Sequence, residues 1–322
     1  MTDIIQQCDT WLEDITYASG TAGLKLHDWV AAHRRNILAR LEHTGVVLLR
    51  RLSLISSAQF GTVAAALFGV ELAPYTQRST PRTELRGKVY TSTEYPPEEV
   101  IPQHSENSYS HEWPMKIGFL CLVPANSGGA TPVTDNRRVY EGIPAGIREK
   151  FERKGIAYIR NYGAAGVPWQ ESFQTDSRAE VERYCRLYGI EYQWTQDDGL
   201  RTRQVCGAVA IHPYTGAKVW FNQAHLFHVS NHTGENRQAL QRAFHENDLP
   251  RHAYYADGEP LEEDALQVIR AVYARETRAF SWEPGDVLLL DNMLCAHGRQ
   301  PYTGTRKVLV AMAEARTWGA AA

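Results

Sequence analysis

EPGDVLLLDNMLCAHGR (residues 283–299) is the stretch of this sequence that most clearly indicates the fold. Residues 283–286 are typical of a turn, and the apolar run that follows predicts a buried strand over residues 286–292. His297 follows that strand closely, and a second apolar strand is expected over residues 308–312. The C-terminal part of the chain is therefore predicted to form buried strands, with a histidine between them.

Upstream of this stretch, from about residue 87, short β-branched and aromatic runs alternate with Pro, Gly and Asn turns. Examples are residues 88–93, 117–123 and 205–211. Such spacing favours a barrel or sandwich over a parallel α/β sheet. We predict a mostly β fold with helices, in which a double-stranded β-helix (jelly roll, cupin-like) core is decorated by inserted and N-terminal helices.

Helical segments surround the predicted strands. The sequence predicts a helix over residues 32–44, a strand over 46–49, and a helix that begins at the capping box of residues 56–59 and ends near Gly69. Later helices are expected over about 177–187, 235–246 and 262–275. We interpret residues 1–322 as one domain, with about 160–200, rich in Gly and aromatic residues, as a lid insertion.

Composition excludes several classes of protein. Lys plus Arg is 34 and Asp plus Glu is 37, a formal net charge of −3, whereas a general nucleic-acid binder carries a basic excess. No apolar run is long enough to predict a membrane span. The N-terminus does not resemble a secretion signal, and the five cysteines include no CxxC pair. We therefore expect a cytoplasmic protein with reduced thiols.

His104-Ser105-Glu106 offers an imidazole and a carboxylate two residues apart. In a strand these two side chains project from the same face, although such a triplet alone is a weak signal. His297 adds a second imidazole, and two His with one carboxylate on adjacent barrel strands form the facial triad that holds Fe(II). Arg306, nine residues beyond His297, suits the far carboxylate of a dicarboxylate co-substrate.

With these residues in view, the sequence resembles the TauD/TfdA superfamily of Fe(II)/2-oxoglutarate oxygenases, and within it the SyrP-like branch from natural-product pathways. The resemblance covers about residues 40–315. It is carried by residues 78–82 and 89–95, by the metal motif at 104–114, by Gly-Gly-Ala-Thr-Pro at 128–132, and by residues 283–292 leading to His297 and Arg306.

The resemblance implies that His104, Glu106 and His297 are iron ligands, with Fe(II), 2-oxoglutarate and O2 as the cofactor, co-substrate and oxidant. It also implies that Thr131 and Arg306 bind the far carboxylate of 2-oxoglutarate. Two features depart from the common family pattern. Glu106 stands where Asp is usual, and the spacing from His297 to Arg306 is short, which keeps Arg299 and Arg316 as alternatives. Because Glu106 fills the carboxylate position, halogenation is disfavoured.

The substrate is less readable from the sequence. By position in the family, Arg78 and Asn107 are candidate substrate contacts, and Arg78 belongs to a basic cluster that reads equally well as a solvated loop. His225, His228 and His232 match no zinc pattern and are interpreted as neighbours of the site or surface residues. Trp220 and Phe221 fit either the active-site wall or the core.

The expected activity is hydroxylation of an unactivated C–H bond, with release of succinate and CO2. The expected substrate is a small molecule, an amino acid or an amino-acid-derived natural-product intermediate, either free or tethered to a carrier protein. A desaturase or cyclase with the same iron chemistry is the alternative enzyme. The alternative outside enzymes is a non-catalytic jelly-roll binding protein with a vestigial site.

Overall fold

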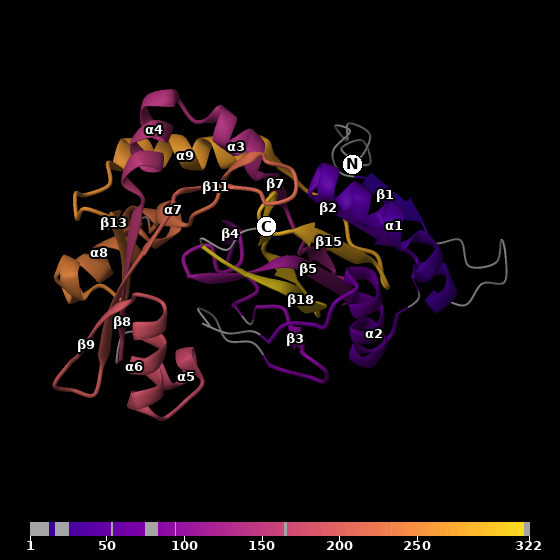
Figure 1. The fold of residues 1–322 in the computed structure, drawn as a ribbon, viewed down its shortest axis with the longest axis horizontal. Helices are drawn as coiled ribbons and strands as arrows, with labels where there is room; N and C mark the ends of the chain where they lie inside the picture. The colour runs from indigo at the N-terminus through magenta and orange to yellow at the C-terminus, as the bar shows by residue number, and fades with distance from the viewer. Residues whose placement is uncertain are drawn as a thin grey trace.

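The computed structural model describes residues 13–16, 26–52, 54–74, 83–93, 95–163, 166–232 and 234–318, and it has the predicted jelly-roll core (Figure 1). The larger sheet has the strand order β1-β2-β15-β5-β18-β3. Its strands are β1 (Glu13–Thr16), β2 (Val46–Arg50), β15 (Val287–Asp291), β5 (Glu112–Val123), β18 (Lys307–Thr317) and β3 (Val89–Thr91). The facing sheet, ordered β14-β7-β16-β4, consists of β14 (Thr277–Arg278), β7 (Val133–Asp135), β16 (Cys295–Arg299) and β4 (Ile101–His104).

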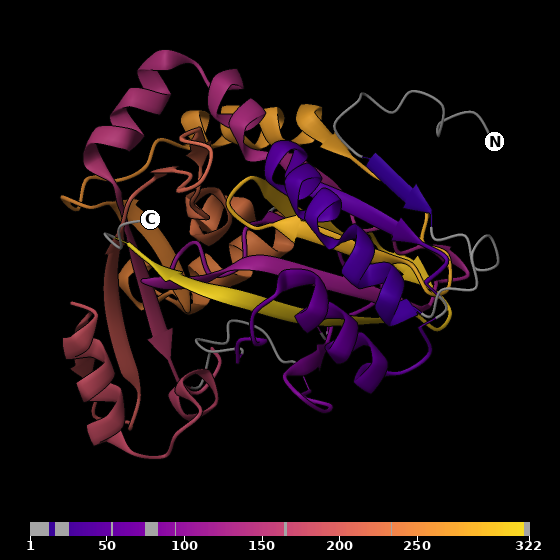
Figure 2. The same ribbon diagram turned by 45° about the vertical axis from the view of Figure 1, so that its right-hand side comes forward.

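The apolar runs that predicted β2 and β15 arise because the larger sheet is buried on both faces. Alternate residues of the two strands, such as Val46 and Leu288, lie in the core that also receives residues of the facing sheet. The residues between them, such as Val47 and Leu289, pack against α1 (Leu26–Thr44) and α2 (Ser57–Phe68). Figure 2 shows these two indigo-to-purple helices covering the outer face of the sheet.

The predicted C-terminal end of α1 and both predicted ends of α2 are confirmed. Ser56 is the N-cap of α2, and its hydroxyl accepts a hydrogen bond from the Gln59 amide at 3.3 Å, as Ser commonly does at this position. Gly69 ends the helix in the left-handed region at φ 70°, where glycine is favoured. Helix α1 begins earlier than predicted, at Leu26, and ends before Gly45. A Cβ at Gly45 would lie 2.6 Å from the Cys295 sulfur, so the chain can pass this close only with glycine there.

A second group of helices packs around another hydrophobic cluster that includes Trp220. Helices α3 (Asn136–Gly142), α4 (Ala145–Lys154) and α9 (Glu263–Glu276) lie together along one edge of the molecule in Figure 1. The short α7 (Ala224–Phe227) and α8 (Gly234–Ala243) follow β12 (Lys218–Trp220), which pairs with β11 (Val209–Ile211). Within the described residues, no helix is long and apolar enough to cross a membrane.

The segment predicted as a lid insertion contributes to a separate four-stranded sheet, ordered β13-β8-β10-β9. Its strands are β13 (Arg251–Tyr255), β8 (Ile156–Tyr162), β10 (Leu200–Cys206) and β9 (Glu191–Trp194). With α5 (Trp169–Phe173) and α6 (Arg178–Leu187) it encloses a small hydrophobic cluster of its own, set to one side of the molecule (Figure 1). Closure of this segment over the site stays a prediction.

One predicted strand is divided. The run at 205–211 was expected as a single strand, but β10 ends at Cys206 and β11 begins at Val209. The two strands belong to different sheets, because β10 pairs with β8 and β9 whereas β11 pairs with β12. A hydrophobic run of this length does not reveal such a change of partner. The last pair of strands is antiparallel and joins segments far apart in the chain, β17 (Tyr302–Thr303) and β6 (Ser127–Gly128).

Candidate metal centre

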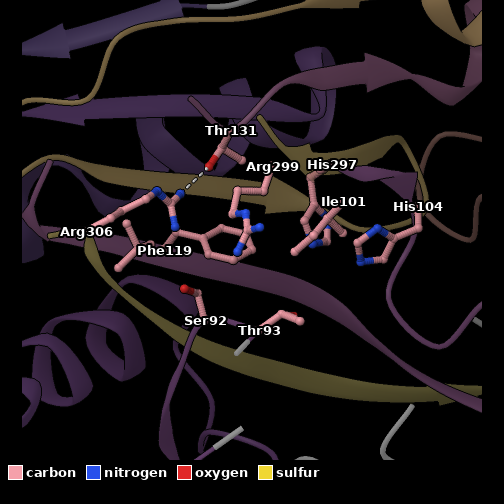
Figure 3. Close-up of a pocket in the computed structure, with 11 residues that line it drawn as sticks. Ser92, Thr93, Ile101, His104, Phe119, Thr131, His297, Arg299 and Arg306 are labelled. Carbon is pink, nitrogen blue, oxygen red and sulfur yellow. Dashed lines mark hydrogen bonds between the residues drawn. The ribbon is translucent and has the colours of Figure 1, made fainter. Parts of the chain in front are cut away.

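His104, Glu106 and His297 come together at the edge of the facing sheet. His104 is the last residue of β4, His297 lies in β16, and the two are direct partners in the antiparallel register. One potential ligand atom from each of the three residues lies within 4.8 Å of the others. The imidazole centroids are 4.6 Å apart, and Figure 3 shows both rings side by side. Within the described residues this is the group of three with metal-ligand geometry.

Glu106 reaches this cluster by a different route from the one expected. The prediction that His104 and Glu106 share one face of a strand is wrong, because β4 ends at His104 and residues 105–110 form a turn. Asn107 adopts φ 57°, a left-handed conformation that Asn tolerates better than most residues. A turn, and not strand periodicity, therefore brings the carboxylate beside the imidazole.

Side chains from distant segments hold this turn. The Asn292 amide accepts from the Glu106 N–H at 2.7 Å and donates to the Glu106 carbonyl at 2.9 Å. Gln223 donates to the Ser105 carbonyl at 2.7 Å, and Asn136 donates to the Ser105 hydroxyl at 2.9 Å. None of these three positioning residues was predicted from the sequence. Asn292 could have been considered, since it lies in the stretch that indicated the fold.

The donor set fits a divalent metal ion. His104 Nδ1 lies 2.8 Å from the Pro102 carbonyl, and because a carbonyl only accepts, Nδ1 carries the proton. This tautomer leaves Nε2 with the lone pair that a metal requires. Glu106 is 3 % exposed and His297 5 % exposed, so a bound cation would offset the cost of burying the carboxylate. Two imidazoles and one carboxylate suit Fe(II) and leave coordination positions open.

A narrow pocket leads from the two histidines to Arg306 and Thr131. The Arg306 Nε donates to the Gly129 carbonyl at 2.9 Å, and its Nη2 lies 3.4 Å from the Thr131 hydroxyl (Figure 3). A Cβ at Gly129 would lie 3.1 Å from the Arg306 Cδ, so glycine lets the loop approach this closely. Burial and the neighbouring Arg299 lower the pKa of Arg306 to about 10, which still leaves the guanidinium charged at neutral pH.

Thr131 is oriented to donate a hydrogen bond into this pocket. Its oxygen accepts from the Trp282 indole at 3.1 Å and from Arg306. Since both neighbours are N–H donors, the single hydroxyl hydrogen remains for an acceptor in the pocket. A guanidinium and a hydroxyl that point to one place form a suitable site for a carboxylate.

The two alternative arginines are engaged elsewhere. Arg299 also lines the pocket, but its Nη atoms donate to the carbonyls of Tyr95, Pro96 and Glu99 at 2.9, 2.5 and 2.8 Å. Arg316, near the end of β18, donates to the Tyr214 hydroxyl and to Glu314. Among the three candidates, Arg306 is the one that both lines the pocket and reaches Thr131.

A larger cavity of about 850 Å³ opens on the other side of His104 and Glu106. Its wall comes from the segment at 95–102, from α8 and from Arg251 of β13. The candidate metal site therefore borders both a narrow pocket and a wide cavity. This arrangement suits a small co-substrate on one side and a larger substrate on the other.

Asn107 and His225 are not members of the group of three potential ligands. Arg78 falls outside the described residues. Asn107 is 4 % exposed, its amide oxygen accepts from the Tyr109 hydroxyl at 3.4 Å, and neither cavity wall described above includes it. His225 stacks on Tyr273 with centroids 4.7 Å apart.

The other aromatic and histidine candidates also have identifiable places. His228 packs against His252 with ring centroids 4.5 Å apart, whereas His232 lines the large cavity. The three histidines of this run therefore do not converge on one point. Trp220 and Phe221 are completely buried in two different core clusters, so both are core residues.

Comparison with known proteins agrees with this geometry. Residues 11–312 match the family "Taurine catabolism dioxygenase TauD, TfdA family". The dapdiamide synthesis protein DdaC of Enterobacter agglomerans is 42 % identical over 273 residues, which cover 84 % of this chain and 83 % of that protein. A clavaminate synthase-like protein of Arabidopsis thaliana is 32 % identical over 286 residues, covering 84 % of this chain and 82 % of that protein.

The fold also matches solved structures. The crystal structure of PvcB from Pseudomonas aeruginosa aligns with a TM-score of 0.53 at 14 % identity and covers 94 % of this chain and 84 % of that one. PvcB is described as an Fe, α-ketoglutarate dependent oxygenase from an isonitrile synthetic pathway. At this identity the match supports the fold alone. From the family match and the DdaC relationship it follows that this chain belongs to the TauD, TfdA family and is an Fe(II)- and 2-oxoglutarate-dependent dioxygenase.

Proposed function

We propose that this dioxygenase hydroxylates an unactivated C–H bond of an amino acid or an amino-acid-derived natural-product intermediate, with release of succinate and CO2. In this proposal His104, Glu106 and His297 hold the iron, and Thr131 and Arg306 bind the far carboxylate of 2-oxoglutarate. The observation that carries it is that the three potential ligands, within 4.8 Å of one another, adjoin the pocket that ends at Arg306 and Thr131.

Each side chain has a defined task. When bound, the iron supplies the activation of O2 that oxidation of a C–H bond requires. The protein orients the ligand side chains and shields them from water. The Pro102 carbonyl orients the His104 ring, and Phe119 packs against the His297 ring with centroids 5.1 Å apart. Arg306 and Thr131 hold the far carboxylate of 2-oxoglutarate, so that the 2-oxo acid group at its other end faces the metal.

Two observations support the substrate class. The relative DdaC is named as a dapdiamide synthesis protein, which supports a role in natural-product formation. The cavity of about 850 Å³ exceeds what a single free amino acid fills, which supports a larger intermediate or a tethered aminoacyl group. The free and the carrier-tethered form of each candidate substrate should therefore be tested side by side for turnover.

The first experiment is anaerobic titration with Fe(II) and 2-oxoglutarate, followed by visible spectroscopy. Chelation of Fe(II) by a 2-oxo acid gives a weak charge-transfer band, which we expect for the wild-type protein. His104→Ala should abolish the band through loss of metal, and Arg306→Ala should demand much more 2-oxoglutarate. Arg316→Ala, an arginine outside the pocket, is the matched control.

A wild-type protein that binds Fe(II) but gives no band with 2-oxoglutarate would contradict the assignment of the pocket. The reaction type is tested separately by mass spectrometry of the product. A gain of one oxygen atom supports hydroxylation, whereas loss of two hydrogen atoms supports the desaturase or cyclase alternative.

A further inference from the structure

Two arginines lie side by side in the wall of the substrate cavity. Arg251 of β13 and Arg160 of β8 are direct partners in the antiparallel register, so their side chains project from the same face of the sheet. Arg251 lines the large cavity that also exposes His104 and Glu106. Both arginines line an adjoining cavity of about 270 Å³, which places the pair where the two spaces meet.

Aromatic rings flank the two guanidinium groups. The Arg251 guanidinium carbon lies 5.5 Å from the Phe227 ring centroid, and that of Arg160 lies 4.7 Å from the Tyr162 ring centroid. Arg160 also approaches the Ser172 hydroxyl at 3.4 Å. Within the part of the chain that the structure describes, neither Asp nor Glu forms an ion pair with Arg251.

Keeping two positive charges together in such a place is unfavourable. Like charges directly opposite one another on neighbouring strands destabilise a sheet. Burial lowers the pKa of Arg251, and the charge of Arg160 lowers it further. Arg251 is exposed by its solvent-accessible surface and borders the two cavities, so small molecules can reach its side chain. An anion seated between the two guanidinium groups would remove the repulsion and use their donor geometry.

We propose that Arg251 and Arg160 form an anion-binding site that receives a carboxylate or phosphate group at the far end of the substrate. This proposal rests on the proposed function, since it assumes that the substrate extends through the same cavity to the metal cluster. The substrate class is then an extended molecule with its reactive C–H at one end and an anionic group at the other. His232 also lines the large cavity. Burial and the charge of Arg251 both lower the pKa of its imidazole, so the ring is uncharged at neutral pH.

The test uses the anaerobic Fe(II)·2-oxoglutarate complex, prepared with one equivalent of 2-oxoglutarate so that Arg306 is occupied and little free dicarboxylate competes for the two arginines. Three small probes are titrated by calorimetry: propionate, methyl phosphate, and propionamide as the neutral counterpart of propionate. We expect saturable binding of at least one anion and none of propionamide. Preference for propionate identifies a carboxylate site, and preference for methyl phosphate identifies a phosphate site.

Arg251→Gln should weaken binding of the preferred anion by about tenfold or more, as expected for the loss of a charged hydrogen-bond donor. Arg160→Gln should act in the same direction and serves as the second variant if the first folds poorly. Arg153→Gln, on the exposed face of α4, should leave the affinity unchanged.

The proposal is overturned if no anion binds saturably, if propionamide binds as well as propionate, or if both variants bind like the wild type. The charge-transfer band of the same samples separates the two proposals. Its presence with unchanged anion binding in the variants rejects only the anion site, whereas its absence from the wild type rejects the proposed function.

Discussion

The side-chain amide of Asn292 hydrogen-bonds both backbone groups of Glu106, accepting from the N–H at 2.7 Å and donating to the carbonyl at 2.9 Å. A further bond from Asn292 to the Pro114 carbonyl, at 2.8 Å, ties the turn to the start of β5. Asn292 is completely buried and follows β15 directly. One residue therefore connects the stretch that indicates the fold with Glu106 of the candidate metal site.

Replacing Asn292 should weaken metal binding although the residue touches no metal. In Asn292→Ala the Glu106 N–H and carbonyl lose their partners, and residues that orient ligands commonly contribute roughly 10–100-fold in metal affinity. We expect a loss of this size in titrations with Fe(II) or Mn(II). Asn247→Ala, at an exposed site, is the control. An unchanged metal affinity in Asn292→Ala would show that the turn keeps its conformation without Asn292.

Thr131→Val should raise the KM for 2-oxoglutarate roughly tenfold with little change in kcat, because it removes one hydrogen bond to a charged carboxylate. The substitution keeps the shape of the side chain but leaves the Trp282 indole without its acceptor. Thr131→Ser retains the hydroxyl and should recover most of the affinity. Steady-state kinetics with varied 2-oxoglutarate decide the matter, and equal KM values for Val and Ser variants would argue against a direct contact.

Arg299 is expected to hold the wall of the large cavity in place. Its guanidinium donates to three carbonyls between Tyr95 and Glu99, and both of these residues line the cavity. Arg299→Met should destabilise the protein by about 1–3 kcal/mol, since three carbonyls lose a charged hydrogen-bond donor.

Hydrogen exchange over residues 95–101 provides the local measurement for Arg299→Met. Exchange there should accelerate while exchange in β5 and β15 stays slow. Uniform acceleration throughout the core would instead indicate a global loss of stability with no specific effect on the cavity wall.

The stability of the protein should fall as the pH drops from about 6.5 towards 4, in part through His228. Burial, and then the neighbouring His252 and Arg270, lower the pKa of His228 to about 4 from 6.5, against the opposing charges of Glu263 and Glu246. Between these two pH values the unfolded chain binds a proton that the native protein does not, so acid favours unfolding. The Ser230 amide donates to Nδ1 at 3.2 Å and supports the neutral ring.

His228→Gln should therefore lose less stability than the wild type between pH 7 and pH 5. A single imidazole adds at most about 1.4 kcal/mol per pH unit to the slope. Urea unfolding at both pH values measures the difference, with His245→Gln at an exposed position as control. Equal slopes in all three proteins would mean that His228 takes up its proton in the native state as easily as in the unfolded chain.

Several features of the fold were predictable because their causes are local. The capping residues of α2 act within one helical turn, and the apolar runs of β2 and β15 reflect burial on both faces of the sheet. The pairing of His104 with His297 was also expected, since the residue types and their order carry the family resemblance. Where the strand pattern was extended beyond His104, it failed, because a turn does not obey the alternation of a strand.

The sequence by itself thus determined the jelly-roll core, the His, Glu and His residues of the candidate metal site, and the class of co-substrate. Only the tertiary structure decided which arginine faces Thr131, how Asn292 orients Glu106, and that Arg251 lies beside Arg160 at the cavity. The physical reason is the separation along the chain of the residues that interact. Periodicity and capping act over a few residues and leave a visible pattern, whereas these contacts join segments far apart in the chain and depend on the register of strands that pair only after folding.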